Sequence, residues 1–228
     1  MISPTAGAAS AGRPEGLPTA PPGDCPLCPR LAKFRADNRA RHPGFHNAPV
    51  VSFGPLAASL LVVGLAPGLK GANATGRPFT GDYAGDLLYA TLVKFGFARG
   101  QYGGRADDGL GLVDARITNA VRCVPPENKP VGAEIKACRP YLESEISAMP
   151  RLAVILALGT IAHNSVLTTL GHRRAAHPFG HGAVHDLPGG PTLVASYHCS
   201  RYNTNTGRLT TAMFEDVFAT IRDRLDRK

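Results

Sequence analysis

The sequence lacks any stretch that approaches the roughly 18 continuous apolar residues of a membrane-spanning helix. It also lacks an apolar segment behind a basic start, so the pattern of a secretory signal is absent. Residues 1–23 are rich in Ala, Pro and Gly and have almost no apolar periodicity, which leaves them nothing to bury. We therefore expect a cytoplasmic protein with no membrane partner, whose first 23 residues form a disordered tail.

Charged residues are scarce, at 18% of the chain against 43% hydrophobic residues. This balance is typical of a compact globule, and 228 residues suffice for one ordinary domain, predicted over residues 24–228. Acidic residues are fewer than basic ones, since 17 Asp and Glu stand against 25 Lys and Arg and leave a net charge of +8. A polyanionic partner fits that charge, although many basic proteins bind none. Nothing in the pattern requires a dimer, so we expect a monomer.

Apolar runs that close on a glycine or a polar residue alternate with segments of helical periodicity. The runs predict four strands, at residues 60–64, 117–121, 151–158 and 192–197. Alternating strands and helices predict an α/β fold, a three-layer α/β/α sandwich around a central four-stranded, mostly parallel sheet. Such sheets bind ligands at the carboxyl ends of their strands, which is where the polar and Gly-rich sequence of this chain is concentrated.

Four cysteines fall in two pairs, Cys25 with Cys28 and Cys123 with Cys138, and Cys199 stands apart. Disulfides are rare in cytosolic proteins, so the two pairs predict a metal site with four thiolates that ties the N-terminal segment to the fold. The alternative is that the cysteines are unrelated small core residues. Zinc and an iron–sulfur cluster both accept four thiolates, and the ligand count does not separate them.

Glycines crowd the segment that follows the first predicted strand, GLAPG at 64–68 and GANATGRPFTGD at 71–82. Glycine suits places where the backbone turns sharply or approaches a ligand closely. The segment matches neither the GxxxxGK[ST] nor the GxGxxG phosphate-binding pattern, which argues against a nucleotide cofactor.

Five motifs stand in one order along the chain: the two Gly-rich strings, TNAVRC-x-PPENKP, FGHGAVHDL and YHCSRYNTNTGRLT. Together they resemble the family-5 (type B) uracil-DNA glycosylases, and the match covers about residues 24–225. The resemblance implies the uracil-DNA glycosylase fold and excision of uracil from DNA. The paired cysteines are similar to those that hold a structural [4Fe–4S] cluster in the iron–sulfur branch of that superfamily, with Zn²⁺ as the alternative.

The resemblance also implies roles for individual side chains. Phe79 would stack on the extruded base, with packing of its own loop as the alternative. Asn119 would read the uracil edge, and His198 would donate a hydrogen bond to uracil O2 as the bond breaks. Asp82 would stabilise the cation-like sugar and activate water, although a simple helix N-cap explains it equally well. The predicted base-binding residues are Gly64, Leu65, Ala66, Gly68, Phe79 and Asn119.

The loop after the fourth strand mixes cations, an aromatic ring and small hydroxyls, as suits phosphate contacts and a wedge that fills the place of a flipped base. The predicted DNA-binding residues are Ser200, Arg201, Tyr202, Asn203 and Arg208. Arg201 and Tyr202 are the candidates for the wedge. Cys199 replaces the proline or small apolar residue common in the family, so this loop could bend differently here. His177, His181 and His185 are expected to form hydrogen bonds rather than bind a metal.

Leu65 puts an apolar side chain in the first motif, where related families place a polar or acidic one. Water activation is therefore expected from Asp82, and the family resemblance implies that hypoxanthine and other damaged bases are also accepted. Two other functions remain open from the sequence. One is a non-catalytic, zinc-bearing nucleic-acid-binding module, and the other is a small-molecule hydrolase on the same fold.

Overall fold

The central sheet of the protein forms from the apolar runs of the sequence. The computed structural model describes residues 18–227, and in it five strands pair in the order β4-β1-β5-β7-β6. The first four strands in this order are parallel: β4 (Ala115–Asn119), β1 (Leu60–Gly64), β5 (Val154–Leu158) and β7 (Thr192–Ser196). Every residue of β1, β5 and β7 is buried, which is why these strands read as continuous apolar runs. The predicted α/β class is confirmed.

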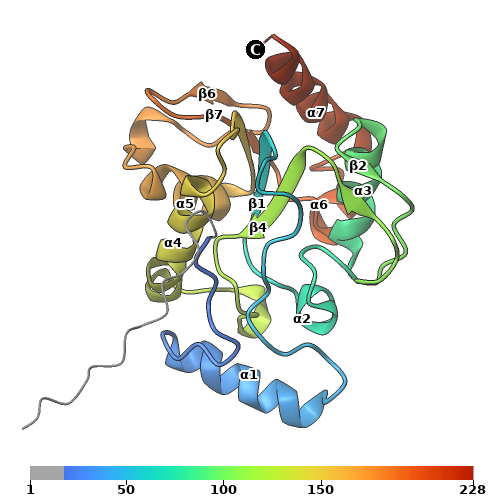
Figure 1. Cartoon of the computed structure of the whole chain (residues 1–228), viewed down its shortest axis with the longest axis vertical. Coiled ribbons are helices and arrows are strands. Elements are labelled where there is room, and N and C mark those ends of the chain that lie inside the picture. Colours follow the sequence, from blue (N-terminus) through green and yellow to red (C-terminus); the bar gives the residue numbers. More distant parts are fainter. Residues whose placement is uncertain (1–17, 228) are drawn as a thin grey trace, which may run out of the picture.

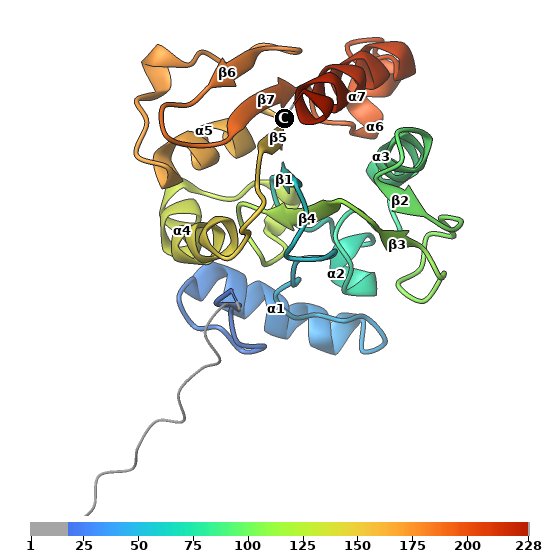
Figure 2. The same cartoon turned by 45° about the horizontal axis from the view of Figure 1, so that its top comes forward.

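Helices cover both faces of the sheet, as Figure 2 shows with α4 and α5 on one side and α3 and α7 on the other. Alternate residues of β1 serve the two faces: Leu60 and Val62 pack toward α3 (Tyr83–Lys94) and α7 (Thr211–Asp226). Leu61 and Val63 pack toward α4 (Gly132–Ser147) and α5 (Thr160–Thr169). Two cores therefore lie back to back across one sheet, as expected for a three-layer sandwich.

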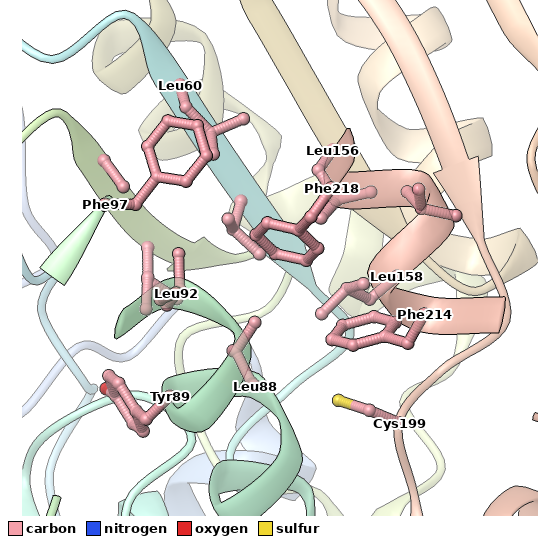
Figure 3. Close-up of a cluster of buried hydrophobic side chains, with 14 of the residues drawn as sticks. Leu60, Leu88, Tyr89, Leu92, Phe97, Leu156, Leu158, Cys199, Phe214 and Phe218 are labelled. Atoms are coloured by element: carbon pink, nitrogen blue, oxygen red, sulfur yellow. The ribbon is translucent and has the colours of Figure 1, made fainter. Parts of the chain in front are cut away.

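The larger core is aromatic where α7 meets α3. Phe214 and Phe218 of α7 face Leu88 and Leu92 of α3 across Leu156 and Leu158 of the sheet (Figure 3). Tyr89 lies at the margin of this cluster and turns its hydroxyl away from it (Figure 3). The hydroxyl donates to the carbonyl of Pro78, so the core is connected directly to the Gly-rich loop.

Shorter elements complete the chain. Helix α1 (Pro29–Arg41) lies below the sheet in Figure 1 and packs through Leu31 against the segment after β4. The remaining elements are short: α2 (Ala72–Thr75), the hairpin strands β2 (Ala98–Arg99) and β3 (Gly111–Leu112), two 3-10 turns at Pro126–Asn128 and Arg174–Ala176, and α6 (Arg201–Asn205). None of the helices in the described part of the chain has the length and apolar character that a bilayer span needs.

Several sequence-based expectations need correction. The third predicted strand begins at Val154 rather than at residue 151. The second predicted strand lies two residues earlier than expected, because Gly64 pairs with Asn119 and the strand ends there. A fifth strand, β6 (Val184–Asp186), pairs antiparallel to β7 in the segment that was expected to be a loop. Residues 18–23 belong to the packed structure rather than to a tail, since Thr19 N–H donates to Ser144 Oγ at 2.6 Å and Pro21 is buried. Residues 1–17 of the predicted tail lie outside the described residues.

Candidate active site

Side chains from three strand ends meet in one cavity. Gly64 ends β1, Asn119 ends β4 at the same register, and His198 follows β7. The cavity opens to solvent. Its lining is Ala66, Pro67, Gly68, Ala72, Phe79, Asp82, Ala84, Asn119 and His198. The parallel sheet therefore brings together the predicted catalytic residues, which are separated by up to 116 positions in the chain (198 − 82).

Phe79 forms one wall of this cavity and stacks on the ring of His198, with 5.8 Å between the ring centroids and 27° between the planes. Its backbone is in the left-handed region at φ +52°, which non-glycine residues adopt rarely. Gly64 leaves room for the ring, because a Cβ there would lie 2.5 Å from Phe79 Cζ and 2.4 Å from Asn119 Oδ1. The first glycine of the motif is thus required by the close approach of two cavity side chains.

Asn119 is 3% exposed, and its buried Oδ1 has no hydrogen-bond partner among the described residues. Such an unpaired acceptor is costly unless something else satisfies it. The amide also carries an N–H₂ group, so one side chain can accept and donate side by side. This arrangement suits a planar ligand that presents an adjacent N–H donor and carbonyl acceptor.

His198 lines the same cavity, and its buried Nδ1 has no hydrogen-bond partner among the described residues. Burial lowers the pKa of His198 to about 4, so the imidazole is neutral near pH 7. The His198 carbonyl accepts a 2.8 Å hydrogen bond from Asn203 Nδ2. Asn203, predicted to contact DNA, therefore braces the backbone of the cavity histidine.

Asp82 is both a helix cap and a cavity residue. Its Oδ1 accepts from Gly85 N–H at 3.3 Å at the start of α3, and the side chain also lines the cavity. A Cβ at Gly71 would lie 2.3 Å from Asp82 Oδ2, so this glycine makes space for the carboxylate. Burial raises the pKa of Asp82 above its ordinary value. Both interpretations of Asp82 are compatible with this geometry.

A wider open groove adjoins the cavity and is lined by some of the remaining predicted residues. Leu65 lines this groove rather than the cavity itself, together with Ser200 and Arg201. Tyr202 is 72% exposed, and the Arg201 guanidinium lies 5.5 Å above the ring of Tyr83. Ser200 Oγ accepts from Asn203 N–H and so caps α6. The Arg208 guanidinium lies 4.6 Å from the ring centroid of Tyr197.

Lys70, Tyr83 and Asn128 are among the groove residues that were missed from the sequence. Asn128 follows Glu127 in the motif PPENKP, and both residues have left-handed backbones at φ +56° and +55°. Two consecutive residues of this kind mark a sharp projecting turn, and only the proline pair before them indicated it in the sequence. Of the predicted histidines, His181 Nδ1 accepts from Tyr197 N–H at 3.2 Å, and His185 Nε2 lies 3.1 Å from the Pro178 carbonyl.

The four paired cysteines line a separate cavity between α1 and α4. N–H donors point at two of the sulfurs: Arg122 N lies 3.3 Å from Cys138 Sγ, and Arg35 Nη1 lies 3.6 Å from Cys123 Sγ. Burial raises the pKa of Cys123 to about 12 and that of Cys138 to about 11, so these free thiols are neutral. Cys199 lies elsewhere, with its thiol donating to the Ala84 carbonyl at 3.4 Å.

The spacing of these cysteines bears on what they could hold. Within residues 18–227, no three Cys, His, Asp or Glu side chains lie close enough together to hold a single metal ion. The four thiols therefore surround a shared space without converging on one point. A tetrahedral zinc ion needs sulfurs at about 2.3 Å from one centre, whereas an iron–sulfur cluster is a larger body held at its corners. Four cysteines around one space are a donor set that both zinc and an iron–sulfur cluster accept.

Comparison with known proteins points to one family. Residues 51–222 match the family described as the Uracil DNA glycosylase superfamily. A type-5 uracil-DNA glycosylase of Thermus thermophilus is 46% identical over 198 residues, which cover 85% of this chain and 90% of that protein. A type-5 enzyme of Pyrobaculum aerophilum is 39% identical over 198 residues, covering 85% and 86%. A type-4 uracil-DNA glycosylase of the same organism is 35% identical over 152 residues, covering 66% and 63%.

Proposed function

The chain belongs to the uracil-DNA glycosylase superfamily, and from that premise we infer that it is a DNA-repair enzyme that excises uracil from DNA. It hydrolyses the N-glycosidic bond between the base and deoxyribose and leaves an abasic site. The observation that carries this function is the cavity that Asn119, His198 and Phe79 line together, with Asn119 Oδ1 and His198 Nδ1 buried and without a partner among the described residues.

The flipped uracil is held by its face and by one edge. Phe79 stacks on the ring of the base. This contact stabilises any flat base, because base–aromatic stacking does not depend on hydrogen bonds. Asn119 Oδ1 accepts from uracil N3–H while its amide donates to O4. Cytosine presents an acceptor at N3 and a donor at C4, so it would leave the Asn119 acceptor unpaired and is rejected.

Bond cleavage divides between His198 and Asp82. The C1′–N1 bond breaks with both electrons leaving on uracil, and the neutral imidazole of His198 donates a hydrogen bond to O2, where the negative charge develops. The sugar becomes cation-like, and the Asp82 carboxylate stabilises it and accepts a proton from the water that forms the new C1′–O bond. Leu65 offers no polar group, so the carboxylate nearest the cavity has to orient that water.

DNA lies along the groove beside the cavity. Lys70 and Arg201 bring positive charge to it, as phosphate contacts require, and the net charge of +8 attracts the polyanion at long range. Tyr202, which follows the groove residue Arg201 and is 72% exposed, enters the space that the flipped base vacates. The enzyme acts as a monomer on DNA.

Cys25, Cys28, Cys123 and Cys138 hold a [4Fe–4S] cluster. When bound, the cluster contributes structure rather than chemistry, because it ties the segment before α1 to the helix that bears Cys138. A brown protein with broad visible absorption and about four irons per chain supports this assignment. A colourless protein with one zinc per chain would show that the four cysteines bind zinc instead of a cluster.

The substrate range extends beyond uracil to hypoxanthine and other deaminated bases. The wall formed by Leu65, Ala66 and Pro67 has no side-chain polar group, so the cavity entrance discriminates little among flat bases. Excision of hypoxanthine from a duplex, measured beside uracil, tests this breadth. Activity on uracil alone would confine the enzyme to one base.

The function is tested by incubating the protein with a duplex that carries one uracil and then cleaving abasic sites with alkali. Strand cleavage at the uracil, and none in a matched duplex with thymine, is the expected result. Intact uracil strands at every salt concentration would refute the glycosylase function. If the protein bound DNA in that case, a non-catalytic binding module would be favoured, and absence of salt-dependent DNA binding would favour a small-molecule hydrolase.

A further inference from the structure

The loop at residues 76–82 carries two cavity residues in a conformation that needs external support. Phe79 has a left-handed backbone at φ +52°, flanked by Gly76 at φ +79° and Gly81 at φ +88°. A non-glycine residue keeps such a conformation only where the surrounding structure holds it. The supports of this loop therefore decide where the Phe79 ring and the Asp82 carboxylate lie.

An ion pair outside the cavity supplies the first support. Arg77 Nη1 and Nη2 donate to Asp108 Oδ1 and Oδ2 at 2.8 and 2.7 Å, and the two side chains are only 5% and 3% exposed. Arg77 Nε donates to Thr80 Oγ1 at 2.7 Å, which folds the loop back on itself. The planar guanidinium thereby fixes both ends of a four-residue stretch that has Phe79 inside it.

Three aromatic rings enclose the guanidinium, at 5.1 Å for Phe53, 5.2 Å for Tyr89 and 5.8 Å for Tyr102. Two of these rings also hold the loop backbone through their hydroxyls. Tyr89 Oη donates to the Pro78 carbonyl at 2.6 Å. Tyr102 Oη donates to the Phe79 carbonyl at 3.2 Å and accepts from Gly81 N–H at 3.1 Å.

Asp108 extends the same support to the loop that bears Tyr102. Its two oxygens accept from Gly103 N–H at 2.9 Å and from Leu110 N–H at 3.1 Å. One carboxylate thus orders the turn at residues 103–110 and holds Arg77 at the same time. The Arg77 guanidinium keeps the pKa of Asp108 well below its ordinary value, so the pair stays ionised wherever the enzyme works.

None of Arg77, Tyr89, Tyr102 and Asp108 lines the cavity or the groove. We propose that the Arg77–Asp108 ion pair, within its aromatic enclosure, is a positioning device for base excision that acts through Phe79 and Asp82. This inference rests on the proposed function. A displacement of about 1 Å in a reacting group can slow an enzyme by about 100-fold, so loosening the pair costs rate rather than binding.

The test compares Arg77→Lys and Asp108→Asn with a matched control, Arg222→Lys. Arg222 also lies over an aromatic ring, 3.9 Å from the Phe97 centroid, and donates to a backbone carbonyl, that of Phe95, at 2.7 Å. Single-turnover excision on a uracil duplex should fall about 10- to 100-fold in both loop variants and stay near wild type in the control. KM should change by no more than about threefold, since DNA contacts are untouched.

Two further readouts separate positioning from general destabilisation. Tyr102→Phe removes only the hydroxyl that bridges Phe79 and Gly81, and it should slow excision while leaving thermal stability close to wild type. Loosening the loop admits water to Asp82, so the acid limb of the rate–pH profile should move to lower pH in Arg77→Lys.

The positioning role would be overturned if the loop variants, at equal folded fraction, excised uracil as fast as Arg222→Lys. The proposed function would stand in that case, because the wild type would still be active. The positioning role would also be overturned if the acid limb of the rate–pH profile did not move and the loss of rate equalled the fraction of unfolded protein. A wild-type protein that released no uracil in the same assay would overturn the proposed function and this inference together.

Discussion

Asp82 combines a structural contact with the catalytic role that we propose for it. It caps α3 through Gly85 N–H and also faces the cavity where its carboxylate is needed. Asn caps helices as well as Asp but carries no charge, so a substitution can separate the two roles.

Asp82→Asn should leave stability within about 0.5 kcal/mol of wild type and slow uracil excision by about 100-fold or more. Asp82→Ala should slow excision similarly and also lose about 1 kcal/mol of stability, because the cap is removed. Urea unfolding and single-turnover kinetics on the same preparations measure both quantities. Full activity in Asp82→Asn would show that Asp82 serves only as a helix cap.

His198 should stay neutral well below the pH at which an ordinary histidine takes up a proton. Burial lowers its pKa to about 4, against about 6.5 in the unfolded chain. Between these values the unfolded state binds more protons, so the contribution of His198 to stability is present above about pH 6.5 and is lost as the pH falls toward 4. NMR of isotope-labelled histidine, with His198→Gln for assignment, should show a neutral ring at about pH 5.5.

The same reasoning assigns the acid limb of the rate. His198 keeps its neutral form until about pH 4, so loss of activity above that value belongs to Asp82, whose pKa is raised by burial. The residual activity of Asp82→Asn should therefore lack this limb. A His198 signal that titrates near 6.5 would contradict the assignment of a neutral donor.

At the scale of the residue, the family resemblance singled out Phe79, Asp82, Asn119 and His198, and these four side chains line one cavity. Asn119 and His198 meet there because the carboxyl ends of parallel strands lie together. The sequence did not locate Leu65 or the direction of Asn203. Leu65 lines the groove and Asn203 turns inward to the His198 carbonyl. A side-chain direction in a loop depends on tertiary contacts that no local pattern encodes.

Among the elements, the turn from β1 into the Gly-rich loop is tightly packed against two cavity side chains. A Cβ at Gly64 would meet Asn119 Oδ1 at 2.4 Å and Phe79 Cζ at 2.5 Å. Neither neighbour can move without changing the shape of the cavity.

Gly64→Ala should cost about 1 to 3 kcal/mol of stability through overpacking and should slow excision by at least about tenfold. Gly132→Ala is the matched control, because a Cβ at this position in the first turn of α4 meets nothing within 4 Å. The control should keep full activity and equal or higher stability. Thermal unfolding and initial rates decide between them, and a fully active Gly64→Ala would contradict the close packing described for this turn.

Sequence periodicity predicted the long helices and the buried strands because burial imposes their patterns. It misplaced β4 by two residues, since Ala120 and Val121 are as apolar as the strand yet bond to Gly64 and Leu65 beyond its end. It missed β6, whose three residues are too few to show alternation. The ends of these strands depend on pairing partners elsewhere in the chain, so the local sequence pattern could not predict them.

At the scale of the whole molecule, the net positive charge can guide DNA to the proposed site only where cations line the groove. Arg201 lies in the groove at the carboxyl ends of the strands, whereas the exposed Arg151 precedes β5 at their amino ends. The two arginines therefore form a matched pair for measuring where DNA lies.

Arg201→Ala should weaken DNA binding and lower the slope of log K against log salt by about 1, because one phosphate contact and its released counterion are lost. Arg151→Ala should leave the slope unchanged. Fluorescence anisotropy with a labelled duplex across a salt series provides the measurement. Equal slopes for both variants and the wild type would place the DNA away from this groove.

The central claim is that one cavity hydrolyses the bond between uracil and deoxyribose. Mass spectrometry of a reaction with a uracil duplex should detect free uracil and abasic strand in a one-to-one ratio for the wild type. With His198→Ala, where the donor to the departing base is gone, both products should fall together by about 100-fold or more. Uracil released equally by this variant, or strands recovered without free uracil, would contradict the account.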